Sequence, residues 1–436
     1  MDVMPAGLPP RPDLGRVNMS VGFVLWPARF LDACQAKRGD FFTLHPQTGR
    51  WIVVTSDPAT IKDVFTGDPN LLYAGAGNIV LQPILGSRSV LLLDGAEHLR
   101  QRRLMLPAFH GERMRVYADV MRAAAERAIA QWPRGRRFEV LPSMQSITLE
   151  VILRAVFGIT EPERVAELSA PLRAVLDTVA SRRRVLSLAL TAGRAGPLSP
   201  WGRFIAARRR ADELLHAEIE ARRRDSASAE RDDVLSMLLA ARDEEGRALS
   251  DEELRDELMT LLVAGHETTA TALAWTLERL ARHPSVLADV EAEHRAGGEE
   301  LLDATIKETL RLRPVVPAVV RQLQAPMTFG GWDLPAGVHI GPSIYLLHRR
   351  PDLYPDPLAF RPQRFLERSY GTYEWIPFGG GVRRCLGASF ALFEMRVVLS
   401  TLLDRVSLQP ARGAGETVTR RAITFAPARG GRIAVA

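Results

Sequence analysis

The chain of 436 residues has little cysteine and almost no lysine. Its two cysteines are Cys34 and Cys385, and its three lysines are Lys37, Lys62 and Lys307. Two cysteines so far apart in the sequence exclude the disulfide framework of a small secreted protein. They suit a reducing compartment, and we expect a cytoplasmic protein.

Long apolar segments are also missing. The apolar run at 21–26 stops at Pro27, far short of the roughly 20 residues that span a bilayer. The N-terminus has no basic segment ahead of a long apolar core, which a signal peptide requires. The sequence therefore predicts neither a membrane span nor a secretion signal.

Arginine supplies nearly all of the basic residues, and the formal net charge is +6. The arginines are scattered or stand in short triplets, at 182–184 and 208–210. No nucleic-acid-binding motif accompanies them, so we expect no nucleic-acid partner. We interpret most of them as solvated helix faces, with docking of an acidic protein as the alternative.

Composition is ordinary for a globular protein, with 46% hydrophobic and 25% charged residues. The periodicity predicts a mainly α-helical fold with a smaller β-rich region. We expect one unit over residues 1–436 and a monomer. The expected helices lie at 27–38, from Asp57, from His98 to Pro107, at several places in 114–242, at 250–282 and at 301–313. The expected strands lie at 41–44, 51–55, 318–324, 326–329 and 338–344, with an extended lead-in at 1–20, a loop at 74–95 and a closing hairpin of 423–425 with 432–435.

One glycine-rich segment, residues 378–387, stands out, and it reads Phe-Gly-Gly-Gly-Val-Arg-Arg-Cys-Leu-Gly. Three consecutive glycines favour a tight turn, because glycine enters positive φ freely. Cys385 follows at the start of a helix-period run, where free N–H groups and two arginines favour a thiolate. A lone cysteine is more often a small buried residue. One thiolate cannot build a zinc or iron–sulfur site alone, but it can be the axial ligand of a haem.

The segment resembles the haem-binding loop of the cytochrome P450 superfamily, Phe-x-x-Gly-x-Arg-x-Cys-x-Gly. Phe378, Gly381, Arg383, Cys385 and Gly387 occupy the matching positions. The resemblance implies the P450 fold, with haem between a long central helix and the helix after the cysteine. It makes Cys385 the axial ligand, with Phe378 and Gly387 beside the cofactor. Cys-x-x-Cys-His is absent, so we expect haem b, which is not covalently attached.

A long helix is predicted to begin at a capping box of Ser250 and Glu253 and to run to about residue 282. Its middle reads Ala-Gly-His-Glu-Thr-Thr. Ala264 and Gly265 are expected to leave a notch where a flat cofactor approaches the backbone. The alternative is an ordinary buried helix rich in small residues.

The P450 resemblance assigns oxygen activation to the middle of this helix. Glu267 is then the acid and Thr268 the alcohol that supply protons. Thr268 can also bond the carbonyl one turn back. A zinc-protease interpretation is rejected, because it needs a second histidine where Ala270 stands.

His98 and Arg102 lie one turn apart on one predicted helix face, a spacing that suits two neighbouring carboxylates. The resemblance makes these two residues, with Arg321 and Arg383, the holders of the haem propionates. The positive face around Cys385, with Arg103 and Arg384, is expected to dock an acidic electron donor.

Glu308 and Arg311 are three residues apart, and an exposed pair of this kind contributes little. In the P450 pattern the pair is buried and completed by Arg364, and together they support the cysteine loop. Gln363 stands where the family usually has glutamate. We expect this departure to be tolerated because the arginine makes the contact.

The implied function is insertion of one oxygen atom from O2 into a lipophilic small molecule, by hydroxylation or epoxidation. Electrons are expected from a separate ferredoxin and ferredoxin reductase, because no reductase-like segment is present. Two alternatives stay open: a hydrogen-peroxide-dependent peroxygenase and a non-catalytic haem sensor or carrier. Peroxygenase members of the family tend to lack the acid–alcohol pair, and a carrier does not explain it. We do not expect an unrelated helical scaffold with chance motifs, because four motifs occur in the family's order.

The substrate is expected to be apolar, such as a fatty acid, terpenoid, steroid or polyketide. By resemblance, loop 74–95 closes over it, and helices around 193–201 form a lid. Arg88 can anchor a carboxylate or be an ordinary surface arginine. The residues expected to line the pocket are Ile79, Val80, Leu81, Leu85, Leu261, Val315, Val316, Ala318 and Phe425.

Overall fold

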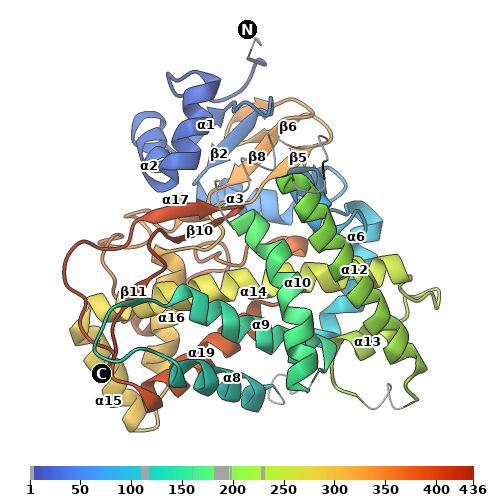
Figure 1. Ribbon diagram of the computed structural model, residues 1–436. Coiled ribbons are helices and arrows are strands. Elements are labelled where there is room, and N and C mark those ends of the chain that lie inside the picture. Colours follow the sequence, from blue (N-terminus) through green and yellow to red (C-terminus); the bar gives the residue numbers. More distant parts are fainter. Residues whose placement is uncertain (1–3, 110–116, 160, 181–195, 197–198, 227–230) are drawn as a thin grey trace.

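The computed structural model describes residues 4–109, 117–159, 161–180, 196, 199–226 and 231–436. Helices form most of it, and the largest sheet lies toward one end beside the N-terminal helices, which confirms the predicted fold class (Figure 1). The main helices are α1 (Arg16–Leu25), α2 (Pro27–Arg38), α3 (Pro58–Thr66), α6 (Gly95–Met105), α8 (Ala118–Ala130), α9 (Leu141–Phe157), α10 (Pro162–Ala180), α12 (Pro200–Arg224), α13 (Val234–Ala240), α14 (Asp251–Arg282), α15 (Pro284–Arg295), α16 (Glu300–Leu312) and α19 (Ala388–Arg405). Short helical turns are α4 (Gly75–Asn78), η1 (Ile79–Leu81), α5 (Gln82–Leu85), η2 (Leu106–Phe109), α17 (Ile344–Leu347), α18 (Arg364–Glu367) and η4 (Gly381–Arg383).

The largest sheet has the strand order β1-β2-β8-β5-β3. Its strands are β1 (Phe41–Leu44), β2 (Ile52–Thr55), β8 (His339–Pro342), β5 (Arg321–Leu323) and β3 (Leu72–Tyr73). β2 and β8 run parallel, whereas the other neighbours are antiparallel. Between β5 and β8, Arg321 faces Ile340 and Gln322 faces His339. Because successive side chains in a strand point to opposite faces, Arg321 and Gln322 lie on opposite sides of this sheet.

Helix α14 crosses the middle of the molecule (Figure 1). The predicted capping box is confirmed: the Glu253 N–H donates to Ser250 Oγ at 3.2 Å, and the Ser250 N–H donates to Glu253 Oε2 at 2.8 Å. The helix continues for 32 residues and stops at His283, ahead of Pro284, because a residue before proline disfavours helical ψ. Most of its side chains are buried against α9, α12, α16 and α19.

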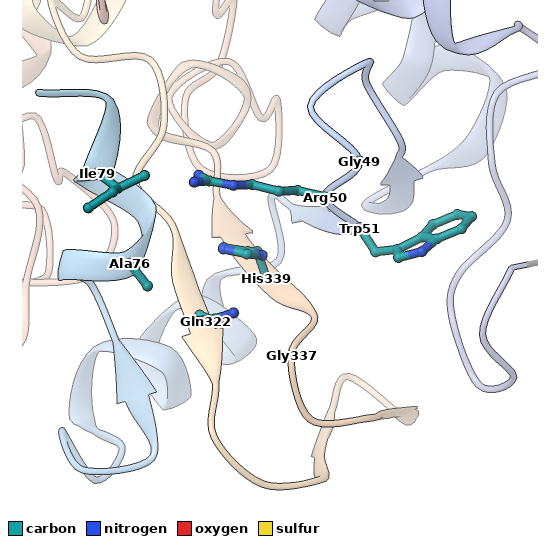
Figure 2. A pocket seen from close by; sticks show the side chains of 8 residues that line it. All are labelled: Gly49, Arg50, Trp51, Ala76, Ile79, Gln322, Gly337 and His339. Atoms are coloured by element: carbon teal, nitrogen blue, oxygen red, sulfur yellow. The ribbon is translucent and has the colours of Figure 1, made fainter. Parts of the chain in front are cut away.

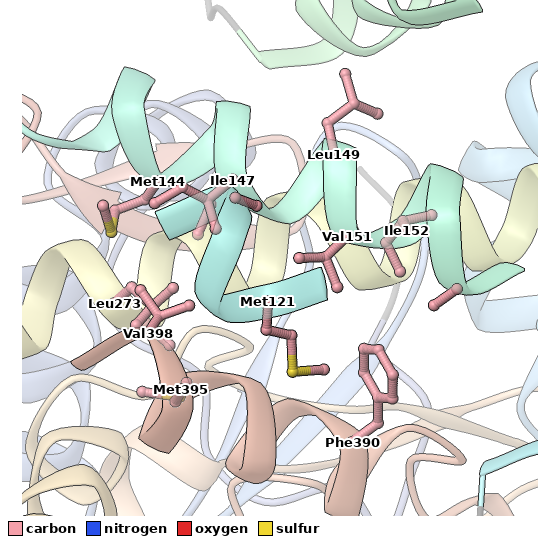
Figure 3. Close-up of a cluster of buried hydrophobic side chains, with 14 of the residues drawn as sticks. Met121, Met144, Ile147, Leu149, Val151, Ile152, Leu273, Phe390, Met395 and Val398 are labelled. Atoms are coloured by element: carbon pink, nitrogen blue, oxygen red, sulfur yellow. The ribbon is translucent and has the colours of Figure 1, made fainter. Parts of the chain in front are cut away.

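The main hydrophobic core fills the space between α8, α9, α14 and α19 (Figure 3). These helices meet mainly through apolar side chains. The core residues labelled in the figure are Met121, Met144, Ile147, Leu149, Val151, Ile152, Leu273, Phe390, Met395 and Val398. This core fixes the position of α14 relative to α19, the helix that follows the cysteine loop.

Two terminal predictions are wrong. Residues 16–20 are the first half of α1 and not part of an extended lead-in, because the prolines end at Pro12 and Met19 anchors a helix in the core. The closing hairpin is also paired differently. β10 (Thr424–Pro427) pairs with β9 (Val418–Arg421), whereas β11 (Arg432–Ile433) pairs with β4 (Phe138–Glu139).

Other expectations need smaller corrections. The loop at 74–95 contains α4, η1 and α5, and a strand hairpin of β6 (Met327–Phe329) with β7 (Trp332–Leu334) includes a strand that was not predicted. Of the expected lid, residues 193–195 and 197–198 lie outside the described residues, as does the arginine triplet at 182–184. Within the described part of the chain, no helix combines the length and apolar character needed to cross a membrane.

Candidate active site

The cysteine loop is a tight turn held by backbone contacts. Gly379 and Gly381 have φ of 67° and 64°, in the region that L side chains rarely adopt. A Cβ on Gly381 would lie 1.9 Å from the carbonyl oxygen of Phe65 in α3. The Cys385 N–H donates to Phe378 O at 2.9 Å and closes the turn. Gly379 is therefore favoured by φ alone, and Gly381 both by φ and by the approach of α3.

Cys385 is the exposed cysteine of the pair, whereas Cys34 is buried. Protein nonetheless surrounds the Cys385 thiol closely enough that burial raises its pKa, against the lowering effect of the Gly387 N–H and of Arg102 and Arg384. The expected stabilisation of the thiolate by a helix N-terminus is thus outweighed by desolvation. One reason is that α19 begins only at Ala388.

Cys34 behaves as an ordinary core residue. It is 3% exposed within a cluster that includes Phe30 and Phe42. Burial raises its pKa to about 11, so it stays a thiol at neutral pH.

The two small residues of the α14 notch have different neighbours. Ala264 is exposed in a helix whose flanking segments are largely buried, and its carbonyl accepts a 2.5 Å hydrogen bond from Thr268 Oγ1. A Cβ on Gly265 would lie 2.6 Å from Cδ1 of Ile152 in α9. The packing of α9 therefore requires a residue without a side chain at position 265.

Glu267 turns away from Thr268 toward two residues distant in sequence. Its Oε2 accepts a 2.6 Å hydrogen bond from Gln145 Nε2, and its Oε1 lies 3.0 Å from Arg421 Nε. Gln145 and Arg421 line a hollow of ≈280 Å³ between α9 and the β9–β10 hairpin. The acid of the predicted pair is thus held beside a polar hollow.

His266, between the small residues and the acid, is a structural residue. Its Nδ1 lies 3.0 Å from Thr148 Oγ1 in the buried interface with α9. Burial and, to a lesser degree, Arg173 and Arg421 lower its pKa to about 3. Among the residues the structure describes, no three His, Cys, Asp or Glu side chains are grouped to hold a metal ion.

The four predicted propionate contacts form one electrostatic cluster. Burial first, then Arg383, Arg102 and Arg321, lowers the pKa of His98 to about 3. Burial also lowers the pKa of Arg321 and of Arg383 to about 10, so both stay charged at pH 7. Arg102 interacts in addition with Cys385. The structure therefore brings the four residues together and connects them to the thiol.

Arg383 is already anchored by the protein. It donates to Val90 O at 3.1 Å, to Leu93 O at 2.5 Å and to Asp94 Oδ1 at 2.6 Å. Asp94 also accepts from the N–H groups of Ala74 and Gly75. Arg383 thus clamps the segment before α6 onto the cysteine loop.

These observations fit a haem. Haem carries two propionate carboxylates, which need cationic hydrogen-bond donors, and an iron that binds a thiolate ligand. The cluster holds three arginines, and Asp94 is the acidic group that acts on Arg321 and Arg383. Arg102 interacts with His98 of this cluster and with the thiol of Cys385. One bound haem can therefore contact both the cluster and the thiol.

The predicted triad is assembled and buried. Glu308 accepts from Arg311 Nε at 2.6 Å and Nη2 at 2.9 Å, and from Arg364 Nε at 3.1 Å. Side-chain exposures are 0% for Glu308 and Arg311 and 2% for Arg364. Arg311 also donates to His348 O at 2.7 Å, and His348 Nε2 accepts from the Ile376 N–H at 2.9 Å. The triad is thereby connected to the segment leading into the cysteine loop.

The predicted pocket residues are dispersed. Leu85 is 0% exposed and Phe425 2%, and both are core residues, with Phe425 packed edge-on against Tyr345. Ile79 and Val80 are on the surface at 45% and 67% exposure. Leu261, Val316 and Ala318 are half-buried, whereas Leu81 and Val315 are buried.

Sequence reasoning missed the residues that tie α14 to the 85–94 segment. Glu257 accepts from the Val90 N–H at 2.7 Å, and Asp256 accepts from the Arg88 N–H at 2.8 Å. Burial raises the pKa of Glu257. The sequence did contain one signal for this contact, namely a carboxylate on the otherwise apolar face of a predicted helix. Gln145 and Arg421 carried no signal, because their partner lies elsewhere in the chain.

Taken together, an α-helical fold, one cysteine on a glycine-rich loop and a cationic cluster beside it define the class of haem-thiolate proteins. The family model described as cytochrome P450 matches residues 9–429. Cytochrome P450 135B1 of Mycobacterium bovis is 45% identical over 98% of this chain and 91% of its own length. Cytochrome P450 135A1 of Mycobacterium tuberculosis is 41% identical, with 98% and 95% coverage.

The solved structures agree. A cyanobacterial protein, CYP120A1 bound to retinoic acid, has a TM-score of 0.84 and 25% identity, covering 98% of this chain and 99% of that one. The haem domain of cytochrome P450DA has a TM-score of 0.84 at 23% identity, which supports the fold. The chain belongs to the cytochrome P450 family and is a haem-dependent monooxygenase.

Two glycines of the cysteine loop provide a matched test of the loop's packing. Gly379→Ala and Gly381→Ala both place alanine at positive φ, which costs about 1–2 kcal/mol. Only Gly381→Ala also collides with α3, because nothing lies near the Cβ of residue 379. We expect Gly381→Ala to lower the free energy of unfolding in urea more than Gly379→Ala and to retain less haem. Equal losses in the two variants would show that the approach of Phe65 does not matter.

The triad generates a second prediction. Glu308→Gln leaves two buried guanidinium groups without their charge partner, so we expect a loss of about 3–5 kcal/mol in unfolding free energy. Glu367→Gln is the control, because Glu367 pairs with Arg361 at exposures of 55% and 48%. Such a surface pair contributes about 0–1 kcal/mol. Urea titrations in which both variants lost the same stability would contradict a supporting role for the triad.

Proposed function

We propose that this P450 inserts one oxygen atom from O2 into a lipophilic small molecule, with haem b ligated by Cys385. The observation that supports this most is the position of Arg102, which interacts both with the thiol and with the cationic cluster. One bound group then contacts all of them. When bound, the haem supplies the redox centre at which dioxygen is reduced.

In this proposal the protein holds the cofactor by charge. His98, Arg102 and Arg321 receive the propionates, while Arg383 contributes charge and keeps the loop in place through Asp94. Burial and the neighbouring arginines lower the pKa of His98 to about 3, so the arginines and not His98 carry the positive charge of this cluster. Phe378 and Gly387 lie beside the thiol, and Ala264 presents the exposed part of α14.

Proton supply is assigned to Glu267 and Thr268. Thr268 Oγ1 donates to Ala264 O, which orients the hydroxyl oxygen on the exposed side of α14. Glu267 receives protons from the hollow lined by Gln145 and Arg421, which connects it with the surface. To deliver a proton toward Thr268, the carboxyl group must leave these two partners, so they position the acid between turnovers.

Electrons come from a separate donor, for which a ferredoxin with its reductase is the proposed pair. The side chains of Arg103 and Arg384 are exposed. Their positive charge attracts an acidic electron donor to the surface around the cysteine loop. Arg103 also pairs with Glu244 at the surface. We propose a monomeric, single-domain protein over 1–436 that works in the cytoplasm.

The substrate class follows from apolar half-buried residues near the proposed site. Leu261 lies one turn before Ala264, and Val316 and Ala318 precede β5. The similar cyanobacterial structure carries retinoic acid, an apolar carboxylic acid. We propose an apolar substrate of comparable character. Peroxygenase activity is the second candidate, and it is disfavoured here by the intact acid–alcohol pair.

Thr268→Ala tests this function. We expect the variant to bind haem and consume NAD(P)H through a ferredoxin chain, while product formed per electron falls about tenfold or more and hydrogen peroxide rises, because a positioned proton donor is lost. Thr269→Ala, a buried neighbour on another face, is the matched control and should keep wild-type coupling.

The same variant separates the alternatives. With hydrogen peroxide as oxidant, Thr268→Ala should lose much less activity than with the ferredoxin chain. A wild-type protein that works with peroxide and is idle with ferredoxin is a peroxygenase, and one that oxidises nothing under either regime is a sensor or carrier. Equal coupling in wild type and Thr268→Ala would remove Thr268 from the mechanism.

A further inference from the structure

Two arginines that are outside the predicted propionate cluster meet at the C-terminal end of α16. Arg313 Nη1 and Arg349 Nη2 both donate to the carbonyl oxygen of Leu312, at 3.2 Å and 3.5 Å. We call Arg313 and Arg349 the arginine pair. Neither residue lines the hollow of ≈490 Å³ that Figure 2 shows between α4, β5 and β8, so the pair is a separate feature of the molecule.

The arginine pair concentrates positive charge in a partly buried place. Both side chains are half-buried, and the Nε atom of each is buried without a hydrogen-bond partner in the described protein. Burial, together with Arg279 and Arg349, lowers the pKa of Arg313 to about 10, so both members stay charged at pH 7. Like charges at short range repel each other strongly where water is partly excluded, and one backbone carbonyl offsets only part of that repulsion.

The carboxylate that acts on Arg313 is already engaged by other arginines. Glu278 Oε2 accepts from Arg279 Nε at 2.6 Å, and Glu278 Oε1 accepts from Arg282 Nε at 2.5 Å. Within the described part of the chain, neither Arg313 nor Arg349 forms an ion pair, and each makes one hydrogen bond, to Leu312 O. Buried polar groups are nearly always paired, so the pair is open to an anion from outside the protein.

Two aromatic rings hold the guanidinium groups of the pair in place. The guanidinium carbon of Arg313 lies 5.2 Å from the ring centroid of Trp275 in α14, and that of Arg349 lies 4.1 Å from the ring centroid of Tyr345 in α17. Tyr345 is fixed in turn, because its hydroxyl donates to Asp32 Oδ2 at 3.0 Å. A guanidinium stacked on a ring still directs its N–H groups outward in its own plane, so the pair is preorganised to donate to an anion.

The arrangement of the charges favours a phosphate group over a carboxylate. Arg279, which is 8% exposed, adds a third positive charge that acts on Arg313. The three arginines come from different parts of the chain: the last turns of α14, the end of α16 and the segment after α17. A tetrahedral phosphate presents oxygens in several directions and carries more charge, whereas the two oxygens of a carboxylate lie in one plane and suit one guanidinium.

We propose that the arginine pair binds a phosphate group, either as inorganic phosphate or as the phosphate of an organic monoester. Arg311 of the buried triad donates to His348 O at 2.7 Å, and Arg313 and Arg349 continue the same two segments. A phosphate group held by the pair therefore fastens these segments together beside the triad. Its binding requires no redox chemistry, so the inference goes beyond the proposed function and stands or fails independently of it.

Calorimetric titration of the haem-loaded protein with inorganic phosphate tests this site, in a chloride buffer of constant ionic strength. We expect saturable binding to wild type that is tighter than the binding of acetate. Arg349→Gln should weaken phosphate binding about tenfold or more, because a charge-assisted hydrogen bond is lost. Arg136→Gln is the control, since Arg136 is an exposed arginine before β4, and it should bind phosphate like wild type.

A second variant protects the test against misfolding. Arg349→Lys keeps the charge but lacks the planar fork, so it should bind phosphate more tightly than Arg349→Gln and less tightly than wild type. Titration with glucose 6-phosphate identifies the source: tighter binding than that of inorganic phosphate supports an organic monoester, and weaker binding supports the free ion. The proposal is overturned if wild type binds phosphate no more tightly than acetate. It is equally overturned if Arg349→Gln binds phosphate like wild type, or if Arg136→Gln loses the same affinity.

Discussion

The burial of α14 is the constraint on which the rest of this structure depends. Its apolar side chains are sequestered against α9, α12, α16 and α19, and its carboxylates Asp256 and Glu257 hold the 85–94 segment through backbone N–H groups. That segment is in turn clamped to the cysteine loop by Arg383. The helix thus sets the distance between its own exposed residue, Ala264, and the thiol of Cys385.

The two faces of the main sheet carry different polar and charged side chains. Arg321 joins His98, Arg102 and Arg383 on one face, where three arginines concentrate positive charge. Gln322 and His339 face the other way with Arg50. Strand alternation alone produces this division, because Arg321 and Gln322 are neighbours on β5. The buried triad around Glu308 supports the same region from the segment that leads into the cysteine loop.

Local features of this chain were predictable from sequence because their determinants are close together along it. The capping box of α14, the Asp57 cap of α3 and the Glu308–Arg311 pair each lie within one turn. Contacts between distant segments were not: Gly265 packs on Ile152, Glu267 meets Arg421, and β11 pairs with β4. Neither helical periodicity nor a helix cap indicates which distant segment a residue will contact. The raised pKa of the Cys385 thiol was unpredictable for a related reason, since desolvation depends on everything packed around the residue.

The central claim is that Cys385, and not Cys34, ligates the haem iron, and the spectrum of the reduced carbon monoxide complex tests it most directly. The account predicts a thiolate-type spectrum for wild type and for Cys34→Ser, and its loss in Cys385→Ser. Haem content measured in the same samples separates loss of the ligand from loss of the cofactor. A thiolate-type spectrum that survives in Cys385→Ser would contradict the account.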